Sequence, residues 1–242
     1  MNDSSLSRAA VAGGKVLVWD LPVRVFHWLL AASFAGAWLT AEQEGWRLLH
    51  VTLGCTVLAL AVLRLVWGVV GSRHARFAAF VRGPRAVASY LGGLARGKPQ
   101  HYLGHNPAGG LAIVALLALA ITAAATGLAT YTLGDAWEEV HETLANLMLG
   151  LVGVHVAAVV VSCWLHRENL VAAMVTGRKR GVSGSGSGSG GTRPWRVLGI
   201  VLLAAVLGFW GWQLSHPADG LGAIAAAETQ GGHGHGAGDG DD

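Results

Sequence analysis

The 242-residue chain is poor in charge, because only 13% of its residues are Asp, Glu, Lys or Arg. A soluble domain usually has about 25%. The chain is also poor in cysteine: Cys55 and Cys163 are the only two, and both lie in apolar runs. No CxxCH motif for covalent c-type haem is present, and no cysteine spacing suits a structural zinc site. With 52% hydrophobic residues, these shortages indicate an integral membrane protein.

Five segments have the roughly 20 mostly apolar residues that a membrane-spanning helix needs. They are 23–41, 48–70, 107–131, 140–165 and 195–214. We therefore expect an all-α integral membrane protein, with a four-helix transmembrane bundle and a fifth transmembrane helix after a Gly/Ser linker. Residues 1–22 lack the apolar core of a signal peptide, so the first helix is expected to be an uncleaved anchor.

This pattern divides the chain into five parts. They are an N-terminal segment (1–22), the four-helix unit (23–180), a Gly/Ser-rich linker (181–194), the fifth transmembrane helix (195–214) and a disordered tail (215–242). The linker could be natural or engineered.

Basic residues are concentrated in two loops. Residues 71–106 have six Arg or Lys and no acid, and residues 166–194 have five against one acid. The tail has five acids and no Lys or Arg. The positive-inside rule puts the N-terminus and both basic loops in the cytoplasm and the tail outside. This distribution explains the net charge of +3 as a topology signal rather than as a nucleic-acid-binding surface.

Four of the eleven histidines lie in or at the ends of the apolar segments: His27, His50, His141 and His155. An ionisable side chain at membrane depth is costly and commonly functional, although one histidine alone could simply bond to a neighbouring helix. His141 and His155 are 14 residues apart, which is ~21 Å along a helix, and they leave nearly the same face. Helix direction places His155 at the depth of His27, near the cytoplasm, and His141 at the depth of His50, near the outside.

Two histidine pairs on facing helices suit two haems that are bound at both axial positions. Such ligation leaves no open iron position, which favours electron transfer over oxygen chemistry. One zinc ion cannot bind ligands ~21 Å apart, and two two-histidine zinc sites would be under-ligated. We therefore expect two b-type haems, an inner one between His27 and His155 and an outer one between His50 and His141.

Two arginines lie at the depth of the inner haem. Arg64 follows His50 by 14 residues, and Arg24 lies one turn before His27. Either guanidinium could pair with a haem propionate or extend to the cytoplasmic lipid headgroups.

Four segments together resemble a known family. They are VWDLPVRVFHW (18–28), HVTLGCTVLALAVLRLVWG (50–68), YLGHNPAGG (102–110) and HRENLVAAMVTGRKR (166–180). They are similar to the bacterial cytochrome b561 family, which includes the b-type subunits of membrane-bound nickel–iron hydrogenases. The resemblance covers about 15–180. It implies a four-helix, di-haem unit of the bacterial inner membrane, with the same four histidines as ligands, whereas the periplasmic position of the tail rests on loop charge alone.

The resemblance also implies a function. The chain would carry electrons between the quinone pool and a periplasmic c-type cytochrome, hydrogenase or dehydrogenase. A quinone site would border His27, His155 and the loop 71–106. In that loop His105 could contact quinone or a propionate, or have only a structural role beside the N-cap residue Asn106.

Two other functions stay open, and so does the question of whether the chain is itself an enzyme. The first is a superoxide oxidase that passes electrons from superoxide to quinone, although Arg47 is the only outer base near His50. The second is a membrane anchor or assembly subunit of a larger redox complex. The tail sequence GGHGHGAGDGDD (231–242) could bind a metal weakly, dock a basic cytochrome c or be unstructured.

Overall fold

The structure is a computed structural model that describes residues 15–98, 100, 102, 104–180 and 193–223. The predicted linker, apart from its last two residues, and the tail from residue 224 lie outside the described residues. The elements are β1 (Lys15–Leu17), α2 (Leu21–Thr40), η1 (Glu44–Trp46), α3 (Arg47–Val70), α4 (Phe77–Phe80), α5 (Pro84–Ala95), α6 (Pro107–Leu133), η2 (Asp135–Trp137), α7 (Glu138–His166), α8 (Leu170–Thr176), β2 (Arg178–Arg180) and α9 (Arg193–Ser215). The all-α class predicted from the sequence is confirmed.

Four helical stretches are long and apolar enough to cross a membrane. They are Arg47–Val70, Pro107–Leu133, Asp135–His166 and Trp195–Ser215, which match the second to fifth predicted spans. The first predicted span forms as α2 but is not in this group, because Pro22, Arg24 and His27 lower the mean hydropathy of a short helix. Its membrane crossing stays a prediction, which its packing along α3 supports.

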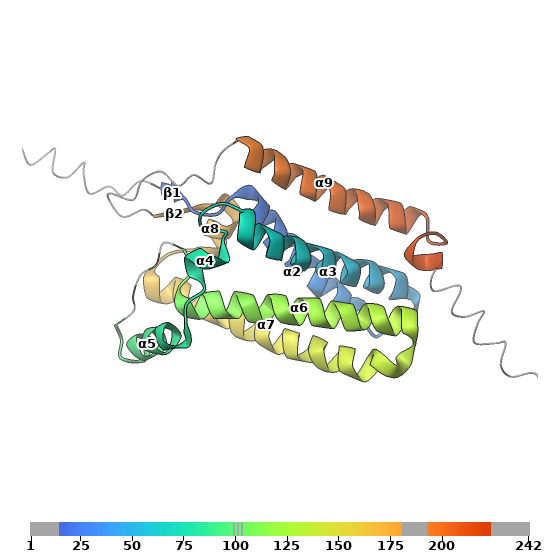
Figure 1. Cartoon of the computed structure of the whole chain (residues 1–242), viewed down its shortest axis with the longest axis horizontal. Helices are drawn as coiled ribbons and strands as arrows, with labels where there is room; N and C mark the ends of the chain where they lie inside the picture. Colours follow the sequence, from blue (N-terminus) through green and yellow to red (C-terminus); the bar gives the residue numbers. More distant parts are fainter. Residues whose placement is uncertain (1–14, 99, 101, 103, 181–192, 224–242) are drawn as a thin grey trace, which may run out of the picture.

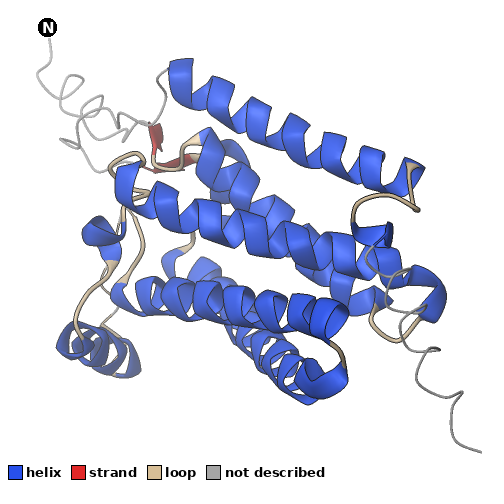
Figure 2. Cartoon of the chain, turned by 45° about the vertical axis from the view of Figure 1, so that its right-hand side comes forward, coloured by secondary structure: helices blue, strands red, loops and turns tan. Residues whose placement is uncertain are grey.

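The long helices pack in a row. Helix α2 packs on α3, α3 on α6 and α6 on α7, while α9 packs on α2. Helices α9 and α7 therefore lie at opposite edges of the molecule, as Figures 1 and 2 show. One buried apolar cluster includes Phe26, Leu60 and Trp67, and α9 packs against it. A second cluster, which includes Ala61 and Met148, joins α3, α6 and α7.

The two ends of the bundle differ in charge. At one end lie β1, α4, α5, α8 and β2 (Figure 1), with the two basic loops of the sequence; we call this the basic end. The other end carries η1, η2 and the acidic residues around them, and we call it the acidic end. Because the chain reverses at each turn, α3 and α7 both begin at the acidic end.

A short antiparallel pair of strands closes the basic end. Lys15 pairs with Arg180 and Leu17 with Arg178, a pairing that the sequence analysis did not predict. The main-chain nitrogens of Val18 and Trp19 donate hydrogen bonds to the Gly177 carbonyl at 2.8 and 3.1 Å. This pairing fixes the start of α2 against the end of α8.

Helix α9 is integrated into the bundle. Trp210 Nε1 donates to Thr56 Oγ1 at 2.9 Å, and the rings of Trp195 and Trp67 meet edge to face with centroids 4.9 Å apart. Beyond α9 the chain folds back, so that the Tyr131 hydroxyl donates to the Leu221 carbonyl. The fifth helix therefore covers α2 and part of α3 along their length.

Candidate functional site

The structure brings the rings of His50 and His141 close together near the acidic end. His50 lies in the first turn of α3 and His141 in the first turn of α7. Their ring centroids are 6.2 Å apart and the ring planes are nearly perpendicular, at 86°. The two helices thus present one imidazole each to a common space.

Each of these rings is oriented by a main-chain carbonyl of a neighbouring helix. His50 Nδ1 donates to Ala37 O on α2, and His141 Nδ1 donates to Ala123 O on α6, both at 2.8 Å. Because a carbonyl can only accept, each Nδ1 has the proton and each Nε2 keeps a free lone pair. The bonding pattern therefore leaves both Nε2 atoms available as metal ligands.

The separation of the two rings suits one metal between them. A metal about 2 Å from each coordinating nitrogen places two opposed imidazole centres about 6 Å apart, close to the separation of this pair. Histidine ligands in proteins usually donate their other ring nitrogen to a carbonyl or carboxylate. The residues present therefore fit a haem whose iron these two imidazoles would hold.

A glycine makes room for the His141 ring. A Cβ atom on Gly127 of α6 would lie 2.7 Å from His141 Cε1, which is closer than a real Cβ contact allows. The absence of a side chain at this position therefore sets how closely the ring packs on α6.

His27 on α2 and His155 on α7 form a looser pair nearer the basic end. They lie close enough to interact electrostatically, but no ring contact joins them in the described part of the chain. His27 Nδ1 is buried and has no hydrogen-bond partner among the described residues. The structure thus places the two histidines at the same level of the bundle. Unlike His50 and His141, they have neither a contact between their rings nor an orienting hydrogen bond among the described residues.

Arg64 is enclosed between α3 and α4 and does not extend to solvent. Its side chain is only 6% exposed, Nη2 donates to Ala75 O at 3.1 Å, and the guanidinium lies over the Phe77 ring at 5.3 Å. Nη1 is buried without a partner in the described residues, and so is Nε of the partly buried Arg24. Both arginines thus offer an unused donor at the level of His27 and His155.

Asp20 is a buried acid to which the sequence reasoning assigned no role. It is 1% exposed; its Oδ1 accepts from Val23 N at 2.8 Å and its Oδ2 from Trp67 Nε1 at 3.3 Å. Its charge also interacts with Arg24 and Arg64. The Asp-Leu-Pro sequence is itself an N-cap signal, so the cap could have been predicted, but the link to α3 could not.

His105 lies between two aromatic rings at the start of α6. Its ring centroid is 4.4 Å from that of Trp19 and 4.6 Å from that of Phe80. Asn106 caps the helix by itself, because its Oδ1 accepts from Gly109 N at 2.7 Å. The His105 Nδ1 is buried and has no partner among the described residues, so the cap does not explain this histidine.

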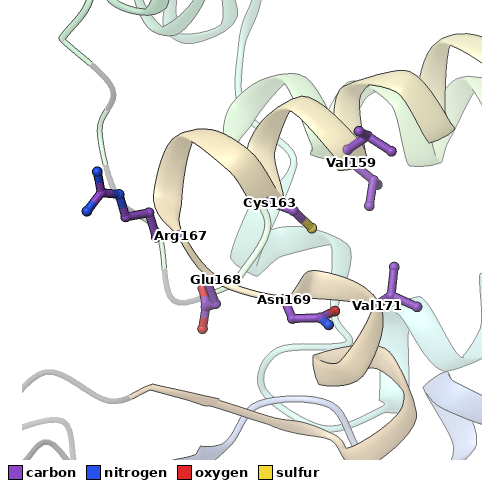
Figure 3. Close-up of a pocket in the computed structure, with 7 residues that line it drawn as sticks. Val159, Cys163, Arg167, Glu168, Asn169 and Val171 are labelled. Carbon is purple, nitrogen blue, oxygen red and sulfur yellow. The ribbon is translucent and has the colours of Figure 1, made fainter.

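A hollow of about 330 Å³ lies at the turn between α7 and α8 (Figure 3). Val159, Val160 and Val171 form apolar walls, and Cys163, Glu168 and Asn169 add polar atoms. In Figure 3 the Arg167 side chain points away from the valines. The hollow begins one helical turn beyond His155, so a ligand there would lie near the basic-end histidine pair.

Comparisons with known proteins identify the family. The family model described as prokaryotic cytochrome b561 matches residues 18–177. A probable Ni/Fe-hydrogenase B-type cytochrome subunit of Azotobacter vinelandii is 30% identical over 67% of this chain and 87% of its own length. A protein of the same description from Rhizobium leguminosarum bv. viciae is 25% identical over 70% of this chain and 91% of its own length.

No solved structure matches the chain at a significant level. The family match spans about two-thirds of the chain and covers the four histidines of the two pairs. The chain therefore belongs to the prokaryotic cytochrome b561 family, which implies haem b, and is a multi-pass bacterial membrane protein of electron transfer.

Proposed function

We propose that the chain moves electrons across the inner membrane between quinone and a periplasmic redox partner, through two bis-histidine b haems. One observation carries the proposal: His50 and His141 face each other at 6.2 Å, and both Nδ1 atoms are engaged by carbonyls. Two imidazoles prepared in this way would hold the iron of a haem. The bound haem would supply reversible one-electron chemistry, and the protein would keep oxygen and other ligands from the metal.

The inner haem lies between His27 and His155 in this proposal. The unused nitrogens of Arg64 and Arg24 are on the same level, and guanidinium groups pair well with carboxylates. These two side chains would bind the haem propionates. The two irons would lie ~21 Å apart along α7, because 14 residues separate its two histidines.

The basic end lies in the cytoplasm, as the positive-inside rule requires. The N-terminus is then cytoplasmic and the C-terminal tail periplasmic. The outer haem pair, at the acidic end, would exchange electrons with the periplasmic partner. The inner pair would exchange them with quinone.

A quinone site near the inner haem agrees with the surroundings of His155. The hollow beside it has valine walls for an apolar ring and polar atoms of Glu168 and Asn169 at its rim. Ligand pockets commonly combine apolar walls with a few polar groups. We place the quinone head group between this hollow and the inner haem, on the cytoplasmic side, where protons are accessible.

The periplasmic partner is proposed to be a hydrogenase. The relatives from Azotobacter vinelandii and Rhizobium leguminosarum are both described as probable Ni/Fe-hydrogenase B-type cytochrome subunits, and the chain spans most of their lengths. A c-type cytochrome or a dehydrogenase would use the same two haems. Superoxide oxidation is less well supported, since Glu138, Glu139 and Glu142 are exposed at the acidic end and would repel the anion.

Haem content tests the proposal. Purified protein is expected to contain two non-covalent haem b groups per chain by pyridine haemochrome assay, and added quinol should reduce both. A sample without haem b would contradict the assignment, and one haem per chain would mean that one pair is wrong. Two haems that quinol cannot reduce would rule out the quinone link while leaving the ligands in place.

Substituting Gly127 should disturb the outer haem alone. In Gly127→Ala the new methyl group meets the His141 ring at 2.7 Å, so the ring must shift away from Ala123 O. We expect weaker binding of one haem and a changed midpoint potential for it in a redox titration. Gly150→Ala is the matched control, because a Cβ atom there meets nothing within 4 Å. Equal effects of the two substitutions would show that the close approach at Gly127 is unimportant.

A further inference from the structure

Four buried side-chain nitrogens at one level of the bundle lack hydrogen-bond partners among the described residues. Arg24 Nε, His27 Nδ1, Arg64 Nη1 and His105 Nδ1 are all buried and lack hydrogen bonds within the described residues. Buried polar atoms in native proteins are nearly always hydrogen-bonded. The shared lack of partners therefore indicates that a polar group from outside the chain belongs among these side chains.

His105 has a position that its own loop does not explain. Its ring packs between the ring of Trp19, which lies in the connection from β1 to α2, and the ring of Phe80, which belongs to α4. Phe80 in turn contacts Phe77, over which the Arg64 guanidinium lies. The same aromatic group thus contacts the side chains that carry two of these four nitrogens, Arg64 Nη1 and His105 Nδ1.

We propose that His105 Nδ1 donates a hydrogen bond to a propionate of the inner haem, next to the one bound by Arg64. This inference rests on the inner haem of the proposed function. It assigns a cofactor-binding role to His105, which is not one of the four proposed iron ligands and is not needed to cap α6.

The charges around His105 favour a carboxylate over a neutral acceptor. Burial lowers the pKa of His105 to about 3, and the positive charges of Arg64 and Lys179 contribute to the shift. The ring is therefore neutral and has one N–H to donate. An anion at this place would be attracted by Arg64 and would accept that N–H, whereas a quinone oxygen would accept the hydrogen bond without adding a negative charge beside the guanidinium.

Two substitutions at the same position separate the hydrogen bond from the ring stacking. His105→Phe keeps an aromatic ring between Trp19 and Phe80 but removes the donor. His105→Asn loses the stacking but can place its amide nitrogen near the position of Nδ1. His216→Phe is the control, because His216 is an exposed histidine beside Trp212 at the acidic end.

The readouts are the propionate bending bands in resonance Raman spectra and the midpoint potentials of the two haems, measured on the full-length protein in detergent. We expect His105→Phe to shift the bands and to lower the inner midpoint potential, because a propionate without this donor stabilises ferric iron more strongly. The outer haem should not change. His105→Asn should restore the bands toward wild type, and His216→Phe should leave both haems as they are.

Unchanged bands and potentials in His105→Phe would overturn the proposal. So would a variant that changes only the KM for quinol, because His105 would then contact quinone. If His105→Phe fails to retain the inner haem, His105→Asn decides: wild-type bands support the proposal, and shifted bands refute it. Failure of the proposed function itself is recognised separately, since wild-type protein would then contain fewer than two haems.

Discussion

Replacing His141 with alanine is expected to remove one of two haems and leave the other with an unchanged spectrum and potential. The loss follows because each haem in this arrangement depends on two imidazoles, and the remaining His50 offers only one. His50→Ala should remove the same haem. The pyridine haemochrome ratio should fall from two haems per chain to one in both variants, and a redox titration should identify the same missing component.

The inner pair should give the complementary result. His27→Ala and His155→Ala are expected to remove the other haem and to retain the one that His141→Ala loses. His216→Ala, at an exposed histidine of the acidic end, should retain both haems. If His50→Ala and His141→Ala lost different haems, the pairing by depth would be wrong even though the four histidines were ligands.

The helices could be predicted from the sequence because apolar run length and mean hydropathy are local properties. Helix α6 begins at Pro107 as expected, and α3 and α7 begin within two residues of the predicted spans. The strands could not be predicted. β1 and β2 are each three residues long, and all three residues of β2 are basic. They pair across the whole four-helix unit, so no local pattern indicates them.

The candidate site was predictable only in part, for a similar reason. The spacing of His141 and His155 follows from helix geometry, and helix direction suggests their partners. The groups that orient His50 and His141 are the carbonyls of Ala37 and Ala123. Main-chain carbonyls have no sequence signature, so this support becomes visible only when the helices are packed.

The surroundings of His105 depend on contacts between distant segments. Trp19 precedes α2, whereas Phe80 belongs to α4, a single helical turn inside the basic loop. The sequence predicted that loop as a topology signal, and its charge gave no indication of an aromatic group folded under it. In the proposed topology the loop therefore has two functions, since its arginines would orient the protein in the membrane and its phenylalanines contact buried side chains.

Substituting Asp20 should have the largest effect on stability of any change outside the histidine pairs. Asp20→Ala removes the N-cap of α2, which is worth about 1 kcal/mol. It also removes the acceptor of the Trp67 indole and the negative charge that compensates Arg64. A buried donor that loses a charged acceptor costs about 1–3 kcal/mol more. We therefore expect the free energy of unfolding to fall by about 2–4 kcal/mol, measured by denaturant titration in mixed micelles.

Two further variants separate the contributions of Asp20. Asp20→Asn keeps an oxygen that can cap α2 but loses the charge, so its stability should lie between wild type and Asp20→Ala. Trp67→Phe removes the indole donor and also part of a buried ring that packs on Trp195, so its cost should exceed that of the lost hydrogen bond alone. Equal stability of Asp20→Asn and wild type would mean that the charge is dispensable, and that Arg64 relies on another anion. The haem propionate would be the natural source, and the destabilisation by Asp20→Asn should then appear only after haem extraction.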